Sequence, residues 1–238
     1  DPSVELVMGP NITDWPKMQP LAENLLVELA AVLHDPVTTT DELIPSGETS
    51  SYRSNPLRLA EFTLSRREPA YVGRAKAVAE IEAERLGGDA PPDYVPRAKK
   101  IAEEESKRRS GCASETLRAA LARFGDADTL LSVTQLGSCV FANKPGDGSA
   151  REQAASCQKV LGGFANICYE FATKRYRSNC INWGILPFTL DADTSFDYAP
   201  GDCVFVPGIR QAIENGIEDI PARVIRTDGA VEDLMLHV

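Results

Sequence analysis

The sequence predicts an α/β domain, because short β segments alternate with helical segments in its C-terminal half. A glycine-containing loop leads into a helix that we expect over Arg151–Leu161. The pattern does not reveal the order of the strands. The segments with strand character are Thr129–Val133, Ala165–Ile167, Ile185–Thr189, Asp202–Val206 and Ala222–Arg226.

Residues 1–36 are interpreted as an N-terminal linker that leads into a domain over 37–238. Four prolines interrupt residues 1–20, around a possible first strand at Val4–Met8. The apolar stretch Leu21–Leu33 fits a strand or a helix, and its periodicity does not decide between them.

A charged helical layer is expected as an insert at about 66–125, added to a β-rich core. Helical spacing begins with Leu57–Ser65 and continues in Tyr71–Leu86, which ends at a Gly-Gly and Pro-Pro stretch. Two further charged helices are expected at Pro96–Arg109 and Glu115–Phe124. Their charges indicate a solvated outer face, although a scaffold or oligomerisation role for these helices stays open.

The net charge of −10 and the pI of about 4.8 disfavour a general nucleic-acid binder, which needs a positive field. Small basic clusters at 99–100 and 107–109 are interrupted by Glu103–Glu105, a pattern typical of a solvated helix. No apolar window is long enough to span a membrane. A small anionic substrate would require arginines concentrated at one place.

The six cysteines form no CxxC pair, and with only two histidines no zinc-site spacing arises. Scattered single cysteines indicate reduced, mostly buried thiols, so we expect a cytoplasmic protein. The chain begins at Asp1 without methionine, which suggests a piece of a longer protein or a processed product.

The most informative segment is Gly146–Gln153. Its glycines allow a tight turn and a close approach of the backbone to a ligand. Ser149 and Glu152 have the spacing of a capping box, and Arg151 offers a planar donor fork for a carboxylate. Taken alone, this pattern is typical of an ordinary helix start; an anion site at the helix N-terminus is the alternative.

This segment resembles the Gly-x-Gly-Ser-Ser-Arg-Glu-His signature of the swivelling domain of aconitases and isopropylmalate isomerases. Downstream, Arg175–Asn179 followed by Gly184–Phe188 is similar to the family's Asn-x-x-x-x-Gly-Leu-Leu-Pro segment. Upstream, Thr39-Thr40-Asp41 followed by Arg53 resembles the family's Thr-Thr-Asp-His segment and its substrate arginine. The resemblance covers roughly 37–60 and 130–210.

The resemblance implies a swivelling β/β/α domain of a hydro-lyase that acts on a hydroxy-di- or tricarboxylate. It implies that Ser149 is the catalytic base and that Asp41 orients groups or buffers charge at the site. Substrate contacts would come from Arg53 and Arg151, with Gly148 and Ala150 in the binding loop. Against this, Arg53 could be an ordinary surface arginine and Asp41 an ordinary cap.

The family also uses a [4Fe-4S] cluster, which this chain is not expected to ligate because it lacks the family's CxxC pair. The resemblance therefore implies a partner, either N-terminal cluster-binding domains of the same polypeptide or a large subunit. We expect no turnover from this chain alone.

Three residues depart from the family pattern. Ala150 replaces the second serine, Gln153 stands in place of histidine, and Glu42 follows Asp41 where the family has histidine. An extra carboxylate at Glu42 would disfavour an anionic substrate unless it is turned away or protonated. The changes leave open a non-catalytic acid-binding or regulatory homologue on the same fold.

Overall fold

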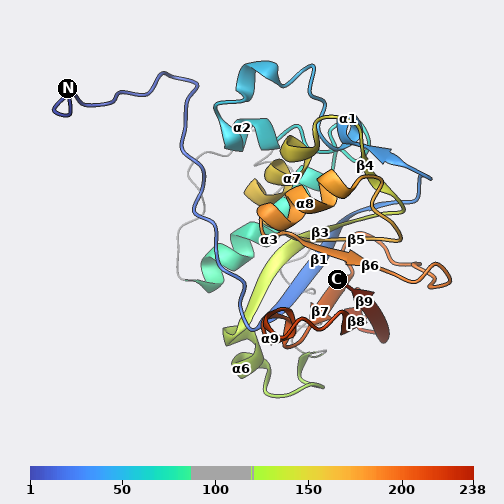
Figure 1. Ribbon diagram of the computed structural model, residues 1–238. Coiled ribbons are helices and arrows are strands. Elements are labelled where there is room, and N and C mark those ends of the chain that lie inside the picture. Colours follow the sequence, from blue (N-terminus) through green and yellow to red (C-terminus); the bar gives the residue numbers. More distant parts are fainter. Residues whose placement is uncertain (87–118, 120) are drawn as a thin grey trace.

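A computed structural model describes residues 1–86, 119 and 121–238 (Figure 1). Within these residues, seven strands form a closed barrel in the order β1-β3-β5-β6-β9-β8-β7. The barrel strands are β1 (Asn24–Leu33), β3 (Thr134–Ala142), β5 (Gly163–Cys168), β6 (Leu186–Thr189), β7 (Cys203–Val206), β8 (Asp219–Ile225) and β9 (Val231–His237).

Half of the barrel is parallel and half is antiparallel. Strands β1, β3, β5 and β6 run parallel, while β7, β8 and β9 pair antiparallel with one another and with their neighbours. Helices α7 (Arg151–Val160) and α8 (Lys174–Asn182) connect β3 to β5 and β5 to β6. The predicted α/β class is confirmed, and the carboxyl ends of the parallel strands meet at one edge of the barrel.

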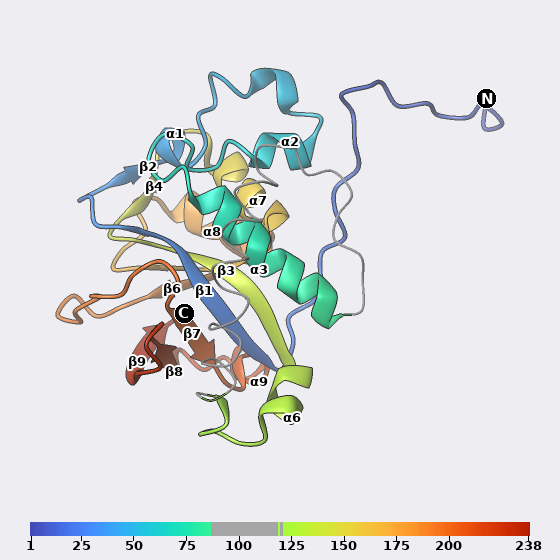
Figure 2. The ribbon, with the colours of Figure 1, turned by 180° about the vertical axis from the view of Figure 1, so that it is seen from behind.

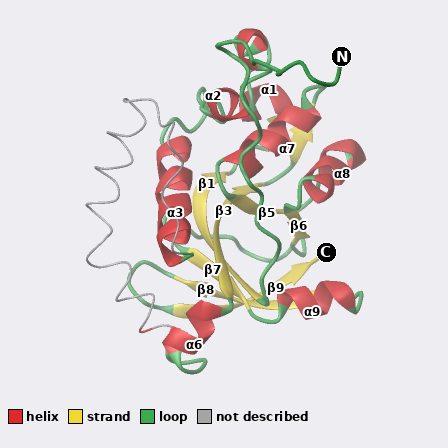
Figure 3. Ribbon diagram, turned by 90° about the vertical axis from the view of Figure 1, so that its left-hand side faces the viewer, coloured by secondary structure: helices red, strands yellow, loops and turns green. Residues whose placement is uncertain are grey.

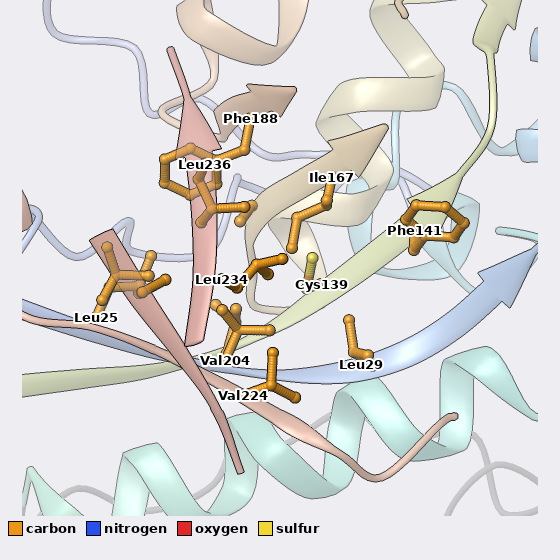
Figure 4. Close-up of a cluster of buried hydrophobic side chains, with 14 of the residues drawn as sticks. Leu25, Leu29, Cys139, Phe141, Ile167, Phe188, Val204, Val224, Leu234 and Leu236 are labelled. Carbon is orange, nitrogen blue, oxygen red and sulfur yellow. The ribbon is translucent and has the colours of Figure 1, made fainter. Parts of the chain in front are cut away.

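The barrel interior is a packed apolar core and not a channel. Each of the seven strands contributes inward-facing side chains, which Figure 4 shows converging between the strands. The residues labelled there are Leu25, Leu29, Cys139, Phe141, Ile167, Phe188, Val204, Val224, Leu234 and Leu236.

A second core lies outside the barrel, between the parallel strands and the helices that cover them. Helix α3 (Tyr71–Arg85) packs on β1 and β3, and α2 (Pro56–Ala60) packs on α7. Figure 3 shows α1 (Thr40–Leu43), α2 and α7 gathered at one end of the molecule, with α6 (Ala127–Ser132) and α9 (Ile209–Glu214) at the other.

The sequence located five elements of the C-terminal half. The structure has α7 at the predicted helix, and β5, β6, β7 and β8 at four of the five predicted strands. It resolves the ambiguous stretch 21–33 as β1, which lies inside the segment 1–36 and joins the barrel. Strands β3, β4 (Pro145–Asp147) and β9 and helices α6, α8 and α9 were not predicted.

The predicted strand at Thr129–Val133 is wrong. These residues lie in and just after α6, whose N-cap Asp126 accepts a hydrogen bond from the Thr129 N–H at 2.8 Å. The neighbouring strand β3 begins only at Thr134. A short apolar run does not distinguish a strand from a helix, and here the capping aspartate decided the outcome.

The predicted first strand at Val4–Met8 is also wrong, because this segment is exposed and pairs with no described strand. The helix expected at Leu57–Ser65 is shorter than predicted. It ends at Ala60, and turns follow, including Leu64 at φ +55°.

The charged helical layer is not confirmed. Helix α3 is present as predicted, but most of its first half is buried, including Tyr71 and Val78. Even Lys76 is buried, where it pairs with Glu61 at 2.7 Å. The helices expected at 96–109 and 115–124, and the basic clusters at 99–100 and 107–109, lie wholly or mostly outside the described residues. Among the described residues, no helix is long and apolar enough to cross a membrane.

Candidate active site

The two segments that carry the predicted site lie side by side, although about a hundred residues separate them in the sequence. The short strand β2 (Thr38–Thr39) pairs in parallel with β4 (Pro145–Asp147). Figure 2 shows β2, β4 and α1 together beyond the end of β1. Because β1 and β3 are parallel neighbours, the segments that follow them emerge at the same edge, the usual position for ligand sites in parallel sheets.

Thr40 joins these two segments directly. Its buried Oγ1 accepts a hydrogen bond from the Ala150 N–H at 3.2 Å. A Cβ on Gly148 would lie 2.4 Å from the same Oγ1, and Gly148 has φ +121°. Glycine is therefore required at 148 for α1 to approach the loop before α7.

Ser149 is exposed and is not the N-cap of α7. Ala150 occupies the N-cap position, and the helix has no side-chain capping bond. The capping box expected from Ser149 and Glu152 is therefore wrong, because the helix starts one residue later. The consequence is chemical: the Ser149 hydroxyl is not used for capping, and it stands just before a helix N-terminus whose N–H groups lack a side-chain partner.

Arg151 lies half-buried at the first position of α7. Its Nε is buried and has no hydrogen-bond partner among the described residues. A buried donor without an acceptor costs about 1–3 kcal/mol. An anionic ligand oxygen would satisfy this donor and would also be favoured by the positive end of the α7 dipole.

Asp41 is exposed, and its carboxylate is already engaged. It forms an ion pair with Arg66 at 3.0 Å and accepts a hydrogen bond from the Ser46 N–H at 3.2 Å. Arg66 also pairs with Glu48 at 2.7 Å. The pKa of Arg66 is raised, first by its hydrogen bond to Glu48 and further by Asp41. This arrangement fits a carboxylate that orients neighbouring groups.

Glu42 is engaged by its local neighbours Thr39 and Arg67. Its carboxylate accepts from the Thr39 N–H at 2.7 Å and from the Thr39 hydroxyl at 2.9 Å, and it also lies 3.3 Å from Arg67 Nε. The Thr39 Oγ1 in turn accepts from the Glu42 N–H, which completes a capping box on α1. The extra carboxylate therefore serves local structure.

Arg53 is exposed at the end of η1 (Ser50–Tyr52), and no hydrogen bond or ion pair joins it to another described residue. The structure thus brings together Asp41, Gly148, Ser149, Ala150 and Arg151, but shows no contact from Arg53 to them. Sequence reasoning missed Thr40 as the link. Thr40 stands inside the quoted Thr-Thr-Asp motif, but its partner lies 110 residues away.

The cysteines do not form a cluster site within the described part of the chain. No group of three His, Cys, Asp or Glu side chains there could hold a metal ion. Burial raises the pKa of Cys157 to about 12 and that of Cys180 to about 11, so both stay protonated thiols, whereas cluster ligands are thiolates. These residues do not fit an iron–sulfur cluster.

Comparison with known proteins supports the resemblance. Residues 107–193 match the family model of the aconitase C-terminal domain. This region contains Gly146–Gln153 and the segment through Phe188, so the predicted resemblance is confirmed there. The upstream segment with Asp41 and Arg53 lies outside the match.

The chain is also similar to the crystal structure of 3-isopropylmalate dehydratase from Methanocaldococcus jannaschii. The two are 15% identical, with a TM-score of 0.44 over 90% of this chain and 81% of that chain. A likeness this distant carries no argument about the site. No curated protein matches the chain.

Proposed function

We propose that this chain is the swivelling domain of an aconitase-like hydro-lyase and supplies one part of its active site. The substrate would be a small hydroxy-di- or tricarboxylate. The observation that carries the proposal is the junction of the two motif segments at β2 and β4, with the unpartnered Arg151 Nε beside the uncapped α7 N-terminus.

Within this proposal Arg151 binds a substrate carboxylate, and the first-turn N–H groups of α7 share that negative charge. Gly148 and Ala150 hold the loop close to the ligand, with the Ala150 N–H fixed by Thr40. Arg53 reaches a second carboxylate when substrate is present, and Asp41 keeps its orienting role through Arg66.

Ser149 would take the proton from the carbon next to the hydroxyl-bearing carbon. Its Oγ stands at a helix N-terminus and near Arg151, where positive potential favours a negatively charged oxygen. Loss of the hydroxyl group from the neighbouring carbon would depend on the part of the enzyme that this chain lacks. That part would be further domains of the same polypeptide or a large subunit, and would carry the [4Fe-4S] cluster.

The decisive test uses the full-length parent enzyme, purified anaerobically with its cluster reconstituted. Dehydration of a panel of hydroxy-di- and tricarboxylates is measured for the wild type and Ser149→Ala. Removing a general base lowers turnover by about 10²–10⁴-fold. The matched control is Ser132→Ala, an exposed serine in α6 at the other end of the molecule, which should leave turnover unchanged.

A second candidate function is a non-catalytic acid-binding homologue. It is favoured by Ala150 in place of the family's serine and by the ion pair that engages Asp41. In that case the parent, with its cluster intact, binds carboxylates but turns over no substrate. Ser149→Ala then has no turnover to lower.

A further inference from the structure

The chain before β1 crosses the helical side of the molecule and contacts Ser54, next to Arg53, and Trp183 at the end of α8. Figures 1 and 3 show this segment passing α2, α7 and α8 before it enters β1. The Thr13 N–H donates to the carbonyl of Ser54, the residue after Arg53, at 3.0 Å. Two residues later, Trp15 packs against Trp183, with ring centroids 4.7 Å apart.

Trp183 connects this contact to the first turn of α7. Its indole N–H donates to Glu152 Oε1 at 3.1 Å, and the ring packs at the margin of the helical core. Glu152 is the immediate neighbour of Arg151. Trp15, Trp183 and Glu152 therefore form a continuous chain of contacts that ends beside the proposed carboxylate site.

If the hydrogen bond from Trp183 is lost, the Glu152 carboxylate has two other favourable positions. Its carboxylate is exposed and sits at a helix N-terminus, where free N–H groups and the helix dipole attract negative charge. The Arg151 guanidinium, with its unpartnered Nε, attracts it as well. Either alternative places a tethered carboxylate where a substrate carboxylate would bind, so a released Glu152 becomes an intramolecular competitor.

We propose that residues 13–15 act as a strap, in which Trp15 packed at a tilt of 39° on Trp183 holds the Glu152 carboxylate away from the anion site at Arg151. Trp183 and Trp15 are positioning residues: they act through Glu152 and do not touch substrate. This inference rests on the proposed carboxylate site and deepens it, because it assigns an element that keeps the site open to anions.

The test uses the full chain and the hydroxyl-free tricarboxylate tricarballylate as a binding probe in calorimetric titrations. Trp183→Phe keeps an aromatic ring but removes the N–H donor, and Trp15→Ala removes the aromatic ring that packs on Trp183. Each should weaken binding by about two- to fivefold, the range of an exposed charge interaction. Leu6→Ala, a fully exposed position on the same segment, should bind like the wild type.

Rescue distinguishes positioning from a general structural effect. Glu152→Gln removes the competing charge but keeps an amide oxygen as acceptor. In the Glu152→Gln background, Trp183→Phe should no longer weaken binding. An equal loss in both backgrounds would overturn the proposal, because the indole would then act by another route.

The two tryptophans also provide a readout that does not depend on ligand, because the chain contains no others. Two indole rings this close and tilted against one another give exciton-coupled circular dichroism, which Trp15→Phe should abolish without loss of helical signal. Absence of that signal in the wild type would overturn the strap.

Failure of the strap and failure of the proposed function give different results. If Arg151→Gln loses tricarballylate binding while both tryptophan variants bind like the wild type, only the strap is overturned. If the wild type binds no tricarballylate, both the carboxylate site and the strap are overturned.

Discussion

Gly146 and Gly148 shape the loop that leads into α7, and neither has room for a side chain. A Cβ on Gly146 would meet the Tyr176 ring atoms Cδ1 and Cγ at 2.2 and 2.4 Å, and Gly146 has φ +96°. Tyr176 is itself fixed, since its hydroxyl oxygen accepts from Gln158 Nε2 at 2.9 Å and Asn166 Nδ2 at 3.1 Å. Because the Tyr176 ring cannot move aside, position 146 requires glycine for packing as well as for its backbone conformation.

We therefore expect Gly146→Ala to lower the free energy of unfolding by about 2–4 kcal/mol, from overpacking combined with a left-handed conformation. The measurement is urea denaturation followed by circular dichroism. Gly47→Ala is the matched control, because a Cβ there meets nothing within 4 Å and the backbone is not left-handed. Equal stability of the two variants would contradict this account.

At the scale of elements, the site depends on how α1 approaches α7. Helix α1 spans only four residues, so its own hydrogen bonds give it little stability. Its position comes from the capping box between Thr39 and Glu42, from β2–β4 pairing, and from the Thr40 hydrogen bond to Ala150. The last of these is the only side-chain hydrogen bond that joins the two motif segments among the described residues.

Replacing Thr40 with the isosteric valine should leave the half-buried Ala150 N–H without its acceptor. We expect a loss of about 0.5–1.5 kcal/mol in unfolding free energy, the net contribution of a typical hydrogen bond. Tricarballylate binding should weaken as well, since the loop before α7 loses its tether. Thr40→Ser keeps the hydroxyl and should bind like the wild type; the idea fails if serine and valine behave alike.

At the scale of the whole molecule, barrel closure depends on a narrow seam between β6 and β9. Only Thr189 and His237 pair across it. The His237 Nδ1 lies 2.9 Å from Asp219 Oδ1 on β8, and its Nε2 lies 3.3 Å from Asp191 Oδ2 just beyond β6. The hydrogen bond to Asp219 is the largest cause of a raised His237 pKa, with Asp191 adding to it.

A histidine whose pKa is raised in the folded state stabilises the protein while it is protonated. Its contribution is complete below the unfolded pKa of about 6.5 and is lost as the pH rises through the higher folded value. Unfolding free energies of the wild type and His237→Gln should therefore differ most near pH 5.5–6 and converge above pH 8. A difference that grows with pH would contradict this sign. The effect should be small, because both aspartates are exposed.

The sequence by itself determined the α/β class, the helix at α7, four barrel strands and the segment Gly146–Gln153. These features depend on neighbours within a few residues: glycine-containing turns, apolar runs and helix spacing. The same local reasoning failed where two signals compete within a short window. At 129–133 the Asp126 cap outweighed an apolar run, and at Ser149 the helix began one residue later than the capping-box spacing indicated.

Only the tertiary structure decided which residues meet. Parallel pairing of β1 with β3 places α1 beside α7, so that Thr40 bonds Ala150, which lies 110 residues away. Ser149 lies one residue before the N-cap position of α7, so its hydroxyl does not cap the helix. The fold also pairs Asp41 with Arg66, which lies 25 residues away. No periodicity or spacing encodes these contacts, because strand order and register arise from burial of side chains contributed by the whole chain.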